Sequence, residues 1–228
     1  MATYVLVPGA MGSSWYWHRV EPLLRARGHD VVAPDLPAED DSAGLARYAD
    51  VIDAAIGDRR GLVLVAQSMG ALSAPLVAAR RAVDLLVLVA PMIPRPGETG
   101  GAWWTSTGQA DAERAMAEEE GRPTGEGFDP TVTFLHDCPP DVAAEANRRA
   151  GAQSTRPFED PWPLAAWPAV PTRVIACRRD RLFPLPFMRR LCRERLAIVP
   201  DEIDTGHLPA LALPGALVDL LERLRESA

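Results

Sequence analysis

The chain lacks long apolar runs, a positive net charge and a cysteine framework. Its longest apolar stretches are interrupted by Gln67, Ser68 and Asp84, so we expect no membrane-spanning segment. A net charge of −7 gives no broad attraction for nucleic acid or anionic lipid. Three cysteines, an odd number without metal-site spacing, predict buried thiols in a reducing compartment. The first seven residues resemble a strand rather than a signal peptide, and we therefore expect a cytoplasmic protein.

The length and composition of the chain indicate one large globular domain. Apolar residues make up 47% of the 228 residues, and charged residues make up 24%. Short, nearly continuous apolar runs predict strands that are covered by helices on both faces, at 3–7, 30–33, 62–66 and 84–89. Helical patterns lie between them, near 15–27, 43–57 and 69–81, with a kink possible at Pro75. This alternation is typical of right-handed βαβ units in an α/β protein.

The alternation stops after residue 90 and resumes near residue 169. The stretch 91–168 has no strand pattern, two predicted helices at 109–120 and 140–150, and a glycine-rich segment at 97–108 that we expect to be mobile. Beyond it we predict a strand at 172–176, a helix at 186–194, a strand near 197–203 and a helix around 213–226. The sequence thus predicts a doubly wound, mainly parallel sheet of about six strands. Residues 1–90 and 169–228 form this core, and residues 91–168 form a helical cap insertion.

A serine lies at the junction between a predicted strand and a predicted helix. The segment Ala66-Gln67-Ser68-Met69-Gly70 resembles the G-x-S-x-G turn, in which a serine nucleophile is exposed on a sharp strand-to-helix bend. Ala66 replaces the first glycine and adds only one methyl group. A serine that simply caps the helix is the alternative interpretation, and this motif alone does not decide between the two.

A serine nucleophile needs a base, and the chain has four histidines. His207 follows the last predicted strand and has a glycine before it, so it is the best candidate. His29 lies in a polar turn at the opposite edge of the predicted sheet, where we expect it to be solvated. His18 and His136 fit packing or substrate contact better than base catalysis.

The base in turn needs a carboxylate that orients it. Asp180 follows the predicted strand 172–176, with three residues between them, and it is our choice. Asp201 and Asp204 are the alternatives, but they are too close to His207 in sequence to favour a side-chain contact. Two backbone amides would stabilise an oxyanion. One is that of Met69, and the other is that of Ala10, in the glycine-containing turn after the first strand. Met11 is the second choice in that turn. All these residues follow the carboxyl ends of predicted strands, which is where open α/β sheets place their sites.

The opening VLVPGAMGSSWYWHRVEPLLRARGHDVVAPDLP and the tail DTGHLPALALPGALVDLL resemble the α/β-hydrolase superfamily. Within it they are similar to the plant esterase and hydroxynitrile lyase branch and its bacterial relatives. The resemblance implies a serine nucleophile at Ser68, an acid at Asp180, a base at His207 and a cap over the pocket. Two positions depart from the pattern. Pro8 replaces the usual histidine, and Leu208 replaces the lysine of the lyases, which argues against cyanide release and for ester hydrolysis.

The sequence therefore predicts a serine hydrolase that cleaves a small-to-medium, uncharged carboxylic ester through an acyl-enzyme. Lactone opening, a C–C bond or biosynthetic reaction on the same residues, and a non-catalytic ligand binder are the alternatives. We expect a small-molecule substrate, no metal or organic cofactor, no nucleic acid and no membrane, and a homodimer is left open. Candidate substrate contacts, which could equally be packing residues of the cap, are Met11, Trp103, Trp104, Phe134 and His136; Phe128, Trp162 and Trp167 are further aromatics of the insertion.

Overall fold

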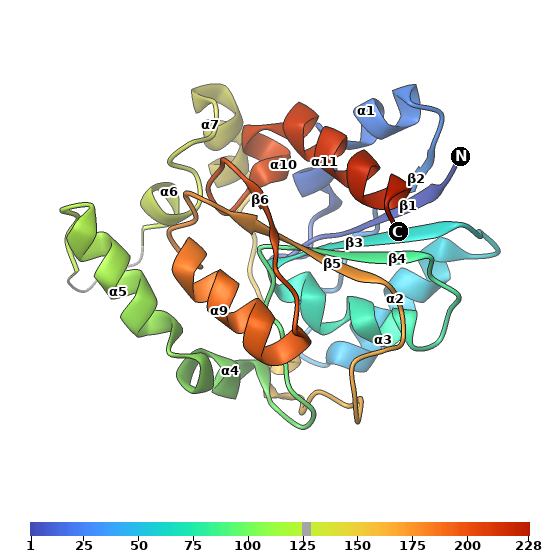
Figure 1. Cartoon of the computed structure of the whole chain (residues 1–228), viewed down its shortest axis with the longest axis horizontal. Coiled ribbons are helices and arrows are strands. Elements are labelled where there is room, and N and C mark those ends of the chain that lie inside the picture. The colour runs from blue at the N-terminus through green and yellow to red at the C-terminus, as the bar shows by residue number, and fades with distance from the viewer. Residues whose placement is uncertain (125–128) are drawn as a thin grey trace.

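The computed structural model describes residues 1–124 and 129–228. Its centre is a six-stranded parallel sheet with the order β2-β1-β3-β4-β5-β6 (Figure 1). The strands are β1 (Thr3–Val7), β2 (Asp30–Val32), β3 (Leu62–Gln67), β4 (Leu85–Val89), β5 (Thr172–Cys177) and β6 (Asp201–Ile203). All six strands were predicted, although the strand expected near 197–203 is limited to its last three residues. The predicted α/β class and the number of strands are confirmed.

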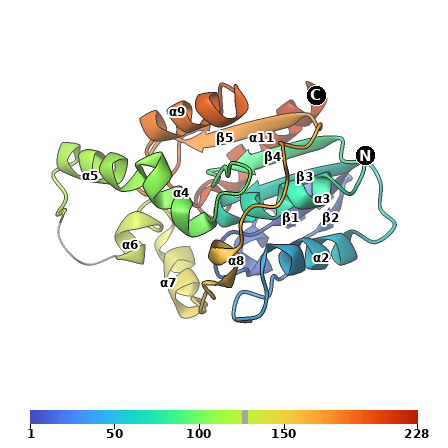
Figure 2. The ribbon, with the colours of Figure 1, turned by 90° about the horizontal axis from the view of Figure 1, so that it is seen from below.

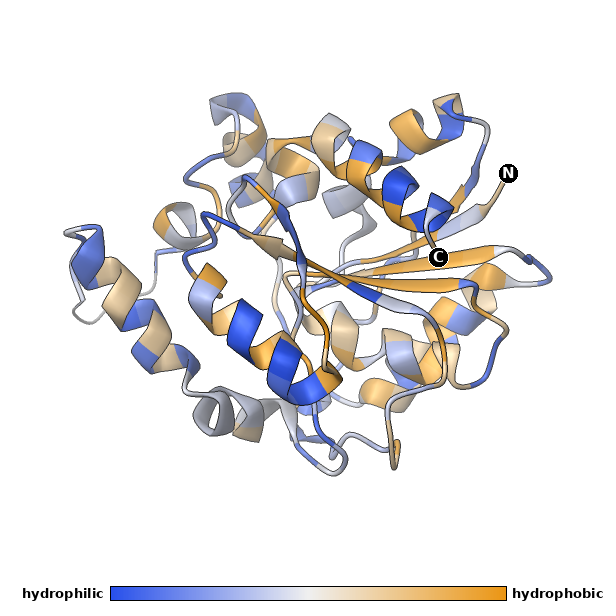
Figure 3. Cartoon of the chain, in the orientation of Figure 1, coloured by the Kyte–Doolittle hydropathy of each residue, from blue (hydrophilic) through white to orange (hydrophobic). Residues whose placement is uncertain are grey.

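Both faces of the sheet are buried, which explains the nearly unbroken apolar runs of its strands. Val5 and Leu64 point into one hydrophobic core, and their neighbours Tyr4 and Val63 point into the other. Successive side chains of a strand alternate between the faces, so a strand buried on both must be apolar at every position. The hydropathy colouring shows this as apolar strands between helices whose outer surfaces are polar (Figure 3).

Helices cover both faces of the sheet (Figure 1). One face carries α1 (Glu21–Ala26), α10 (Pro209–Ala212) and α11 (Pro214–Glu226); the other carries α2 (Leu45–Ile56), α3 (Ala74–Ala78) and α9 (Leu185–Leu196). Two predicted helices are divided in the structure. The segment near 15–27 consists of a 3₁₀ turn, η1 (Ser14–Trp17), followed by α1, and the segment 69–81 consists of η2 (Ser68–Leu72) followed by α3. Pro75 lies in the first turn of α3, where a missing amide costs no helical hydrogen bond.

Between β4 and β5 the chain forms α4 (Gly100–Thr107), α5 (Gln109–Glu119), α6 (Pro130–Thr133), α7 (Pro140–Arg148) and α8 (Arg156–Glu159). They extend beyond one end of the sheet (Figure 2). The segment 97–108, predicted to be irregular and mobile, contains α4 instead. The Thr99 side chain accepts a hydrogen bond from the Ala102 amide at 3.0 Å and caps this helix. Trp103 is fully buried, and its indole N–H donates to the Ile93 carbonyl at 2.9 Å.

A buried ion pair fixes the start of this insertion to the body. The Arg195 guanidinium, on α9, binds both carboxylate oxygens of Glu98, and the two side chains are 3% and 10% exposed. The three cysteines are free, with Cys177 and Cys192 buried as predicted and Cys138 partly buried. No helix in the described part of the chain is long and apolar enough to cross a bilayer.

His29, expected to be solvated, is instead part of a buried polar cluster at the amino edge of the sheet. Its Nδ1 accepts from the Ala2 amide at 3.1 Å, and its Nε2 lies 2.9 Å from Glu222 on α11. The hydroxyl of buried Tyr4 also donates to Glu222, and Arg225 contacts the same carboxylate. Partial burial raises the pKa of Glu222, but hydrogen bonds from Arg225, Tyr4 and His29 outweigh it and lower the pKa to about 2. The sequence separation of 193 residues between His29 and Glu222 hid this contact from the local pattern.

Glu222→Gln should lower the free energy of unfolding at pH 7 by about 2–3 kcal/mol, because buried donors lose a charged acceptor. The pKa of Glu222 is lower in the folded protein than its ordinary value of 4.5, so its carboxylate stabilises the folded state fully above about pH 4.5. This contribution is lost as the pH falls toward about 2. The difference in the free energy of unfolding between wild type and variant, measured with urea, should therefore narrow below pH 4.5. Asp219→Asn is the control, since its ion pair with Arg27 is exposed and contributes less than about 1 kcal/mol. A difference that does not change with pH would contradict the assignment.

Candidate active site

Ser68 lies at a sharp bend between β3 and η2. Its φ is 50°, in the left-handed region that a residue other than glycine rarely adopts. The bend brings η2 against the loop after β1, and a Cβ added to Gly70 would lie 2.6 Å from the Pro8 carbonyl oxygen. Glycine is therefore required at position 70, whereas Ala66 fits within the buried end of β3. The predicted strand-to-helix turn is present, and the strain is concentrated on its serine.

His207 and Asp180 form a hydrogen-bonded row with Ser68. The His207 Nε2 lies 3.0 Å from the Ser68 Oγ, and its Nδ1 lies 2.8 Å from the Asp180 Oδ2. The three side chains come from the ends of β3, β5 and β6, which parallel pairing brings to one edge of the sheet. They are almost completely buried, with Ser68 only 8% exposed. The structure thus joins the three residues that the sequence singled out.

The loop after β5 holds the Asp180 carboxylate in place. Its Oδ1 accepts the amides of Leu182 and Phe183, both at 2.9 Å, which leaves Oδ2 for the imidazole. The alternative Asp204 is exposed and faces Arg179 at 3.4 Å, and Asp201 lies in β6 without a contact to His207 among the described residues. Of these three candidate acids, Asp180 is therefore the one that contacts the imidazole.

Aromatic rings enclose the imidazole. The ring centroids of Phe134 and Phe183 lie 5.3 and 5.2 Å from that of His207. Phe134 belongs to the insertion and Phe183 to the loop after β5. The hydrogen bonds between Ser68, His207 and Asp180 are therefore formed in a largely apolar, water-poor environment, where electrostatic interactions are stronger than in water.

The loop after β1 offers backbone amides beside Ser68. Its turn is closed by the Gly12 amide donating to the Gly9 carbonyl at 3.2 Å, and Met11 has a φ of 65°. The Met11 amide donates to the Gln153 Oε1 at 2.8 Å, whereas the Ala10 amide has no hydrogen-bond partner in the described part of the chain. Of the two amides that the sequence nominated on this loop, that of Met11 is thus engaged and that of Ala10 is not, and the role of Ala10 in binding an oxyanion stays a prediction.

Two glutamines that the sequence did not single out connect the loops of the site. The Gln67 side chain donates to the His207 carbonyl at 3.2 Å and lies directly under Gly9, where an added Cβ would be 2.2 Å from its Oε1. Gln153 joins the Met11 amide to the Tyr48 hydroxyl, with its Nε2 3.2 Å from that oxygen. Neither contact leaves a local signal in the sequence.

The predicted substrate contacts fall into different surroundings. Trp103, on α4, has no exposed surface; its ring packs against Phe187 of α9 and is not accessible to a substrate. Trp104 is partly buried beside Phe183, and Phe134 lies against His207. Met11 is 42% exposed at the turn, and His136 is partly buried against Gly206. Trp162 and Trp167 stack on each other within the core, and Phe128 lies outside the described residues.

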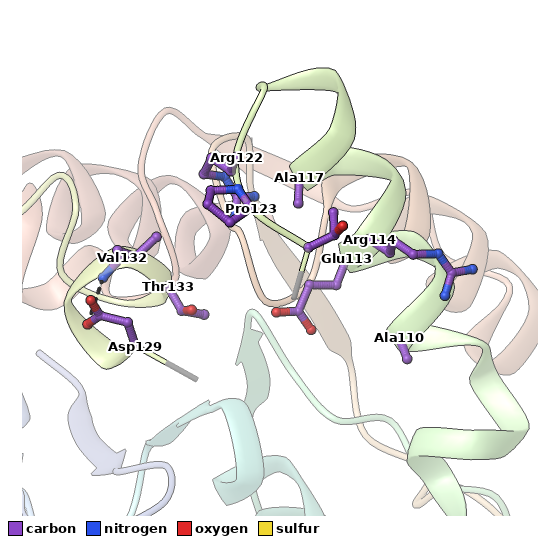
Figure 4. Close-up of a pocket in the computed structure, with 10 residues that line it drawn as sticks. Ala110, Glu113, Arg114, Ala117, Arg122, Pro123, Asp129, Val132 and Thr133 are labelled. Atoms are coloured by element: carbon purple, nitrogen blue, oxygen red, sulfur yellow. Dashed lines mark hydrogen bonds between the residues drawn. The ribbon is translucent and has the colours of Figure 1, made fainter. Parts of the chain in front are cut away.

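A cavity of about 470 Å³ lies between α5 and α6 (Figure 4). Glu113 and Thr133 point into it from opposite walls, and the Asp129 carboxylate accepts a hydrogen bond from the Val132 amide (Figure 4). Ser68, His207 and Asp180 are not among the residues that line this cavity. The two arginines of its lining, Arg114 and Arg122, are paired with Asp111 and Glu120. No group of three or more His, Cys, Asp or Glu within residues 1–124 and 129–228 has the arrangement of a metal site.

Comparisons with known proteins agree with this geometry. A family model described as "Alpha/beta hydrolase family" matches residues 4–220. Methylesterase 7 of Arabidopsis thaliana is 34% identical over 104 residues, and the match spans 40% of each chain. A pyrethroid hydrolase from Sphingobium faniae superimposes with a TM-score of 0.76 at 19% identity and covers 99% of this chain and 98% of its own. A methylesterase from Arabidopsis superimposes with a TM-score of 0.78 at 18% identity, and the superposition covers 100% of each chain. These superpositions show the same fold.

Proposed function

The chain belongs to the alpha/beta hydrolase family, and from this premise we propose that it is a serine esterase that cleaves small-to-medium carboxylic esters through an acyl-enzyme on Ser68. The observation that carries the proposal is the hydrogen-bonded row from Ser68 through His207 to Asp180. A serine hydroxyl is a weak nucleophile until a neighbouring base accepts its proton, and here that base is itself oriented by a carboxylate.

Ser68, His207 and the two backbone amides act in turn in the proposed reaction. The Ser68 oxygen attacks the ester carbonyl carbon, and its proton passes to the His207 Nε2. The amides of Met69 and Ala10 stabilise the resulting oxyanion. The C–O bond to the alcohol then breaks, and His207 gives its proton to the departing oxygen. A water molecule, deprotonated by His207, attacks the acyl-serine, and the acid is released as Ser68 regains its proton.

The surroundings of the site favour an uncharged ester over other substrates. Leu208 follows the base, so no cation at that position is available to stabilise a departing cyanide. The rings of Phe134 and Phe183 lie against the imidazole of His207, and such apolar surroundings favour an uncharged ester beside the base. The methyl-ester and pyrethroid names of the relatives support an ester bond as the point of cleavage.

A fluorophosphonate probe tests this function directly. We expect the folded protein to gain one probe per chain by intact mass, and peptide mapping to place it on Ser68. We also expect turnover of p-nitrophenyl acetate or butyrate. Heat-denatured protein is the control, because it has lost the base that activates the serine. Absence of labelling would contradict the proposal, and so would ligand-induced thermal stabilisation without turnover. Labelling without ester turnover would favour lactone or C–C bond chemistry.

A further inference from the structure

The segment between α6 and α7 packs directly on the loop that carries His207. A Cβ added to Gly206 would lie 2.7 Å from the Asp137 Oδ1 and 2.7 Å from the His136 Cε1. Real side chains do not approach so closely, so glycine is required at position 206 for this contact. The cap thus touches the residue immediately before the proposed base.

At this contact the cap presents a buried carboxylate to the backbone of the loop. The Asp137 Oδ2 accepts the Gly206 amide at 2.6 Å, and the side chain is only 4% exposed. Its Oδ1 is buried and has no hydrogen-bond partner in the described part of the chain. The nearest cation is the half-exposed Arg179, at 3.6 Å. Burying a carboxylate with so little compensation costs several kcal/mol, so a carboxylate here requires a reason other than stability.

The main chain around His207 is held at several points. From the loop after β5, the Arg179 amide donates to the Thr205 carbonyl at 2.9 Å, and its guanidinium donates to the Asp204 carbonyl at 2.7 Å. From β3, the Gln67 side chain binds the carbonyl of His207 itself. The Gly206 amide lies between these points, and Asp137 is its acceptor. The cap therefore supplies one of the bonds that fix the direction of the imidazole.

We propose that Asp137 is a positioning residue for His207, acting through the Gly206 amide so that packing of the cap on the body aligns the base with Ser68. The inference rests on the proposed serine-esterase function. The Asp137 charge also acts over this region: burial raises the pKa of the Cys177 thiol, and the charges of Asp180 and Asp137 raise it further.

Two variants of the full chain separate the hydrogen bond of Asp137 from its charge. Asp137→Ala removes both, and we expect kcat to fall about 10- to 100-fold with KM changed less than about twofold, because a small displacement of the base costs that much. Asp137→Asn keeps an acceptor for the Gly206 amide, so kcat should stay within about threefold. Recovery of kcat in Asp137→Asn but not in Asp137→Ala would show that the acceptor for the Gly206 amide, rather than the negative charge, positions the base.

Asp204→Asn is the matched control, because it removes an exposed carboxylate beside the same arginine without touching the Gly206 amide. It should leave kcat unchanged. Wild-type kcat in Asp137→Ala would overturn the inference, and so would an equal loss of kcat in Asp137→Ala and Asp137→Asn. If thermal melting shows that Asp137→Ala does not fold, Asp137→Leu, which has a similar shape but no hydrogen-bond acceptor, replaces it in the same comparison with Asp137→Asn. Failure of the proposed function is distinguishable, because the wild-type protein would then neither react with the probe nor hydrolyse esters.

Discussion

Ser68→Ala should lower kcat for p-nitrophenyl acetate about 10⁶-fold and abolish labelling by the fluorophosphonate probe. The substitution removes the only oxygen that lies within hydrogen-bond distance of the His207 Nε2 among the described side chains. Residual hydrolysis about 10³-fold above the rate in water should remain, because the Met69 and Ala10 amides still stabilise an oxyanion formed by direct attack of water. Initial rates and intact mass after exposure to the probe provide the two measurements.

Ser73→Ala is the matched control for this variant. Ser73 lies five positions further on and is 1% exposed, and its hydroxyl donates to the Gly70 carbonyl at 3.2 Å. The variant therefore removes a buried serine oxygen from the same stretch of chain and leaves the hydrogen bonds among Ser68, His207 and Asp180 unchanged. We expect its turnover and labelling to stay within a few-fold of wild type. Equal labelling of Ser68→Ala and wild type would require another nucleophile and would refute the mechanism.

The sheet was predictable because its information is local. Strands buried on both faces need apolar residues at nearly every position, and the runs at 3–7 and 62–66 show this without reference to the rest of the chain. The bend at Ser68 was predictable for a similar reason, since a strained turn between strand and helix requires small neighbours such as Gly70. Ser68, Asp180 and His207 also follow the ends of three strands, in that order along the chain.

The insertion was less predictable because its elements depend on distant partners. In α4 the helical pattern is weak, and the helix is held by the burial of Trp103 against the body and by the bond between Arg195 and Glu98. A glycine-rich segment of this kind has no strong local preference, so tertiary contacts decide its structure. The same holds for His29, whose burial depends on α11 at the other end of the chain.

The contacts that hold the loops of the site were not predicted, for a related reason. Gln153 reaches Met11 across 142 residues of sequence, and Asp137 reaches Gly206 across 69. Both side chains bind backbone amides, which are the same at almost every position and leave no complementary residue type to search for. Side-chain chemistry therefore predicts the reacting groups, but not the groups that hold the loops.

Asp180→Asn should lower kcat about 10⁴-fold while the protein keeps its fold. The Asp180 Oδ1 accepts the amides of Leu182 and Phe183, and an asparagine oxygen can keep both bonds. Its NH₂ group then faces the His207 Nδ1, which must accept a hydrogen bond and so loses its proton. The proton of the neutral imidazole moves to Nε2, and Nε2 can no longer accept the proton of Ser68. The wrong tautomer, rather than a loss of structure, causes the decrease.

Asp204→Asn and Asp201→Asn are the controls for this assignment, because these residues were the alternatives for the acid. Neither carboxylate contacts His207 in the described structure, so both variants should stay within about threefold of wild-type kcat. Thermal melting of Asp180→Asn should remain close to that of wild type, because its backbone hydrogen bonds are kept. A near wild-type rate in Asp180→Asn would mean that His207 does not depend on this carboxylate for its tautomer. Asp201 and Asp204 would then have to be reconsidered, with a rearrangement of the loop after β6.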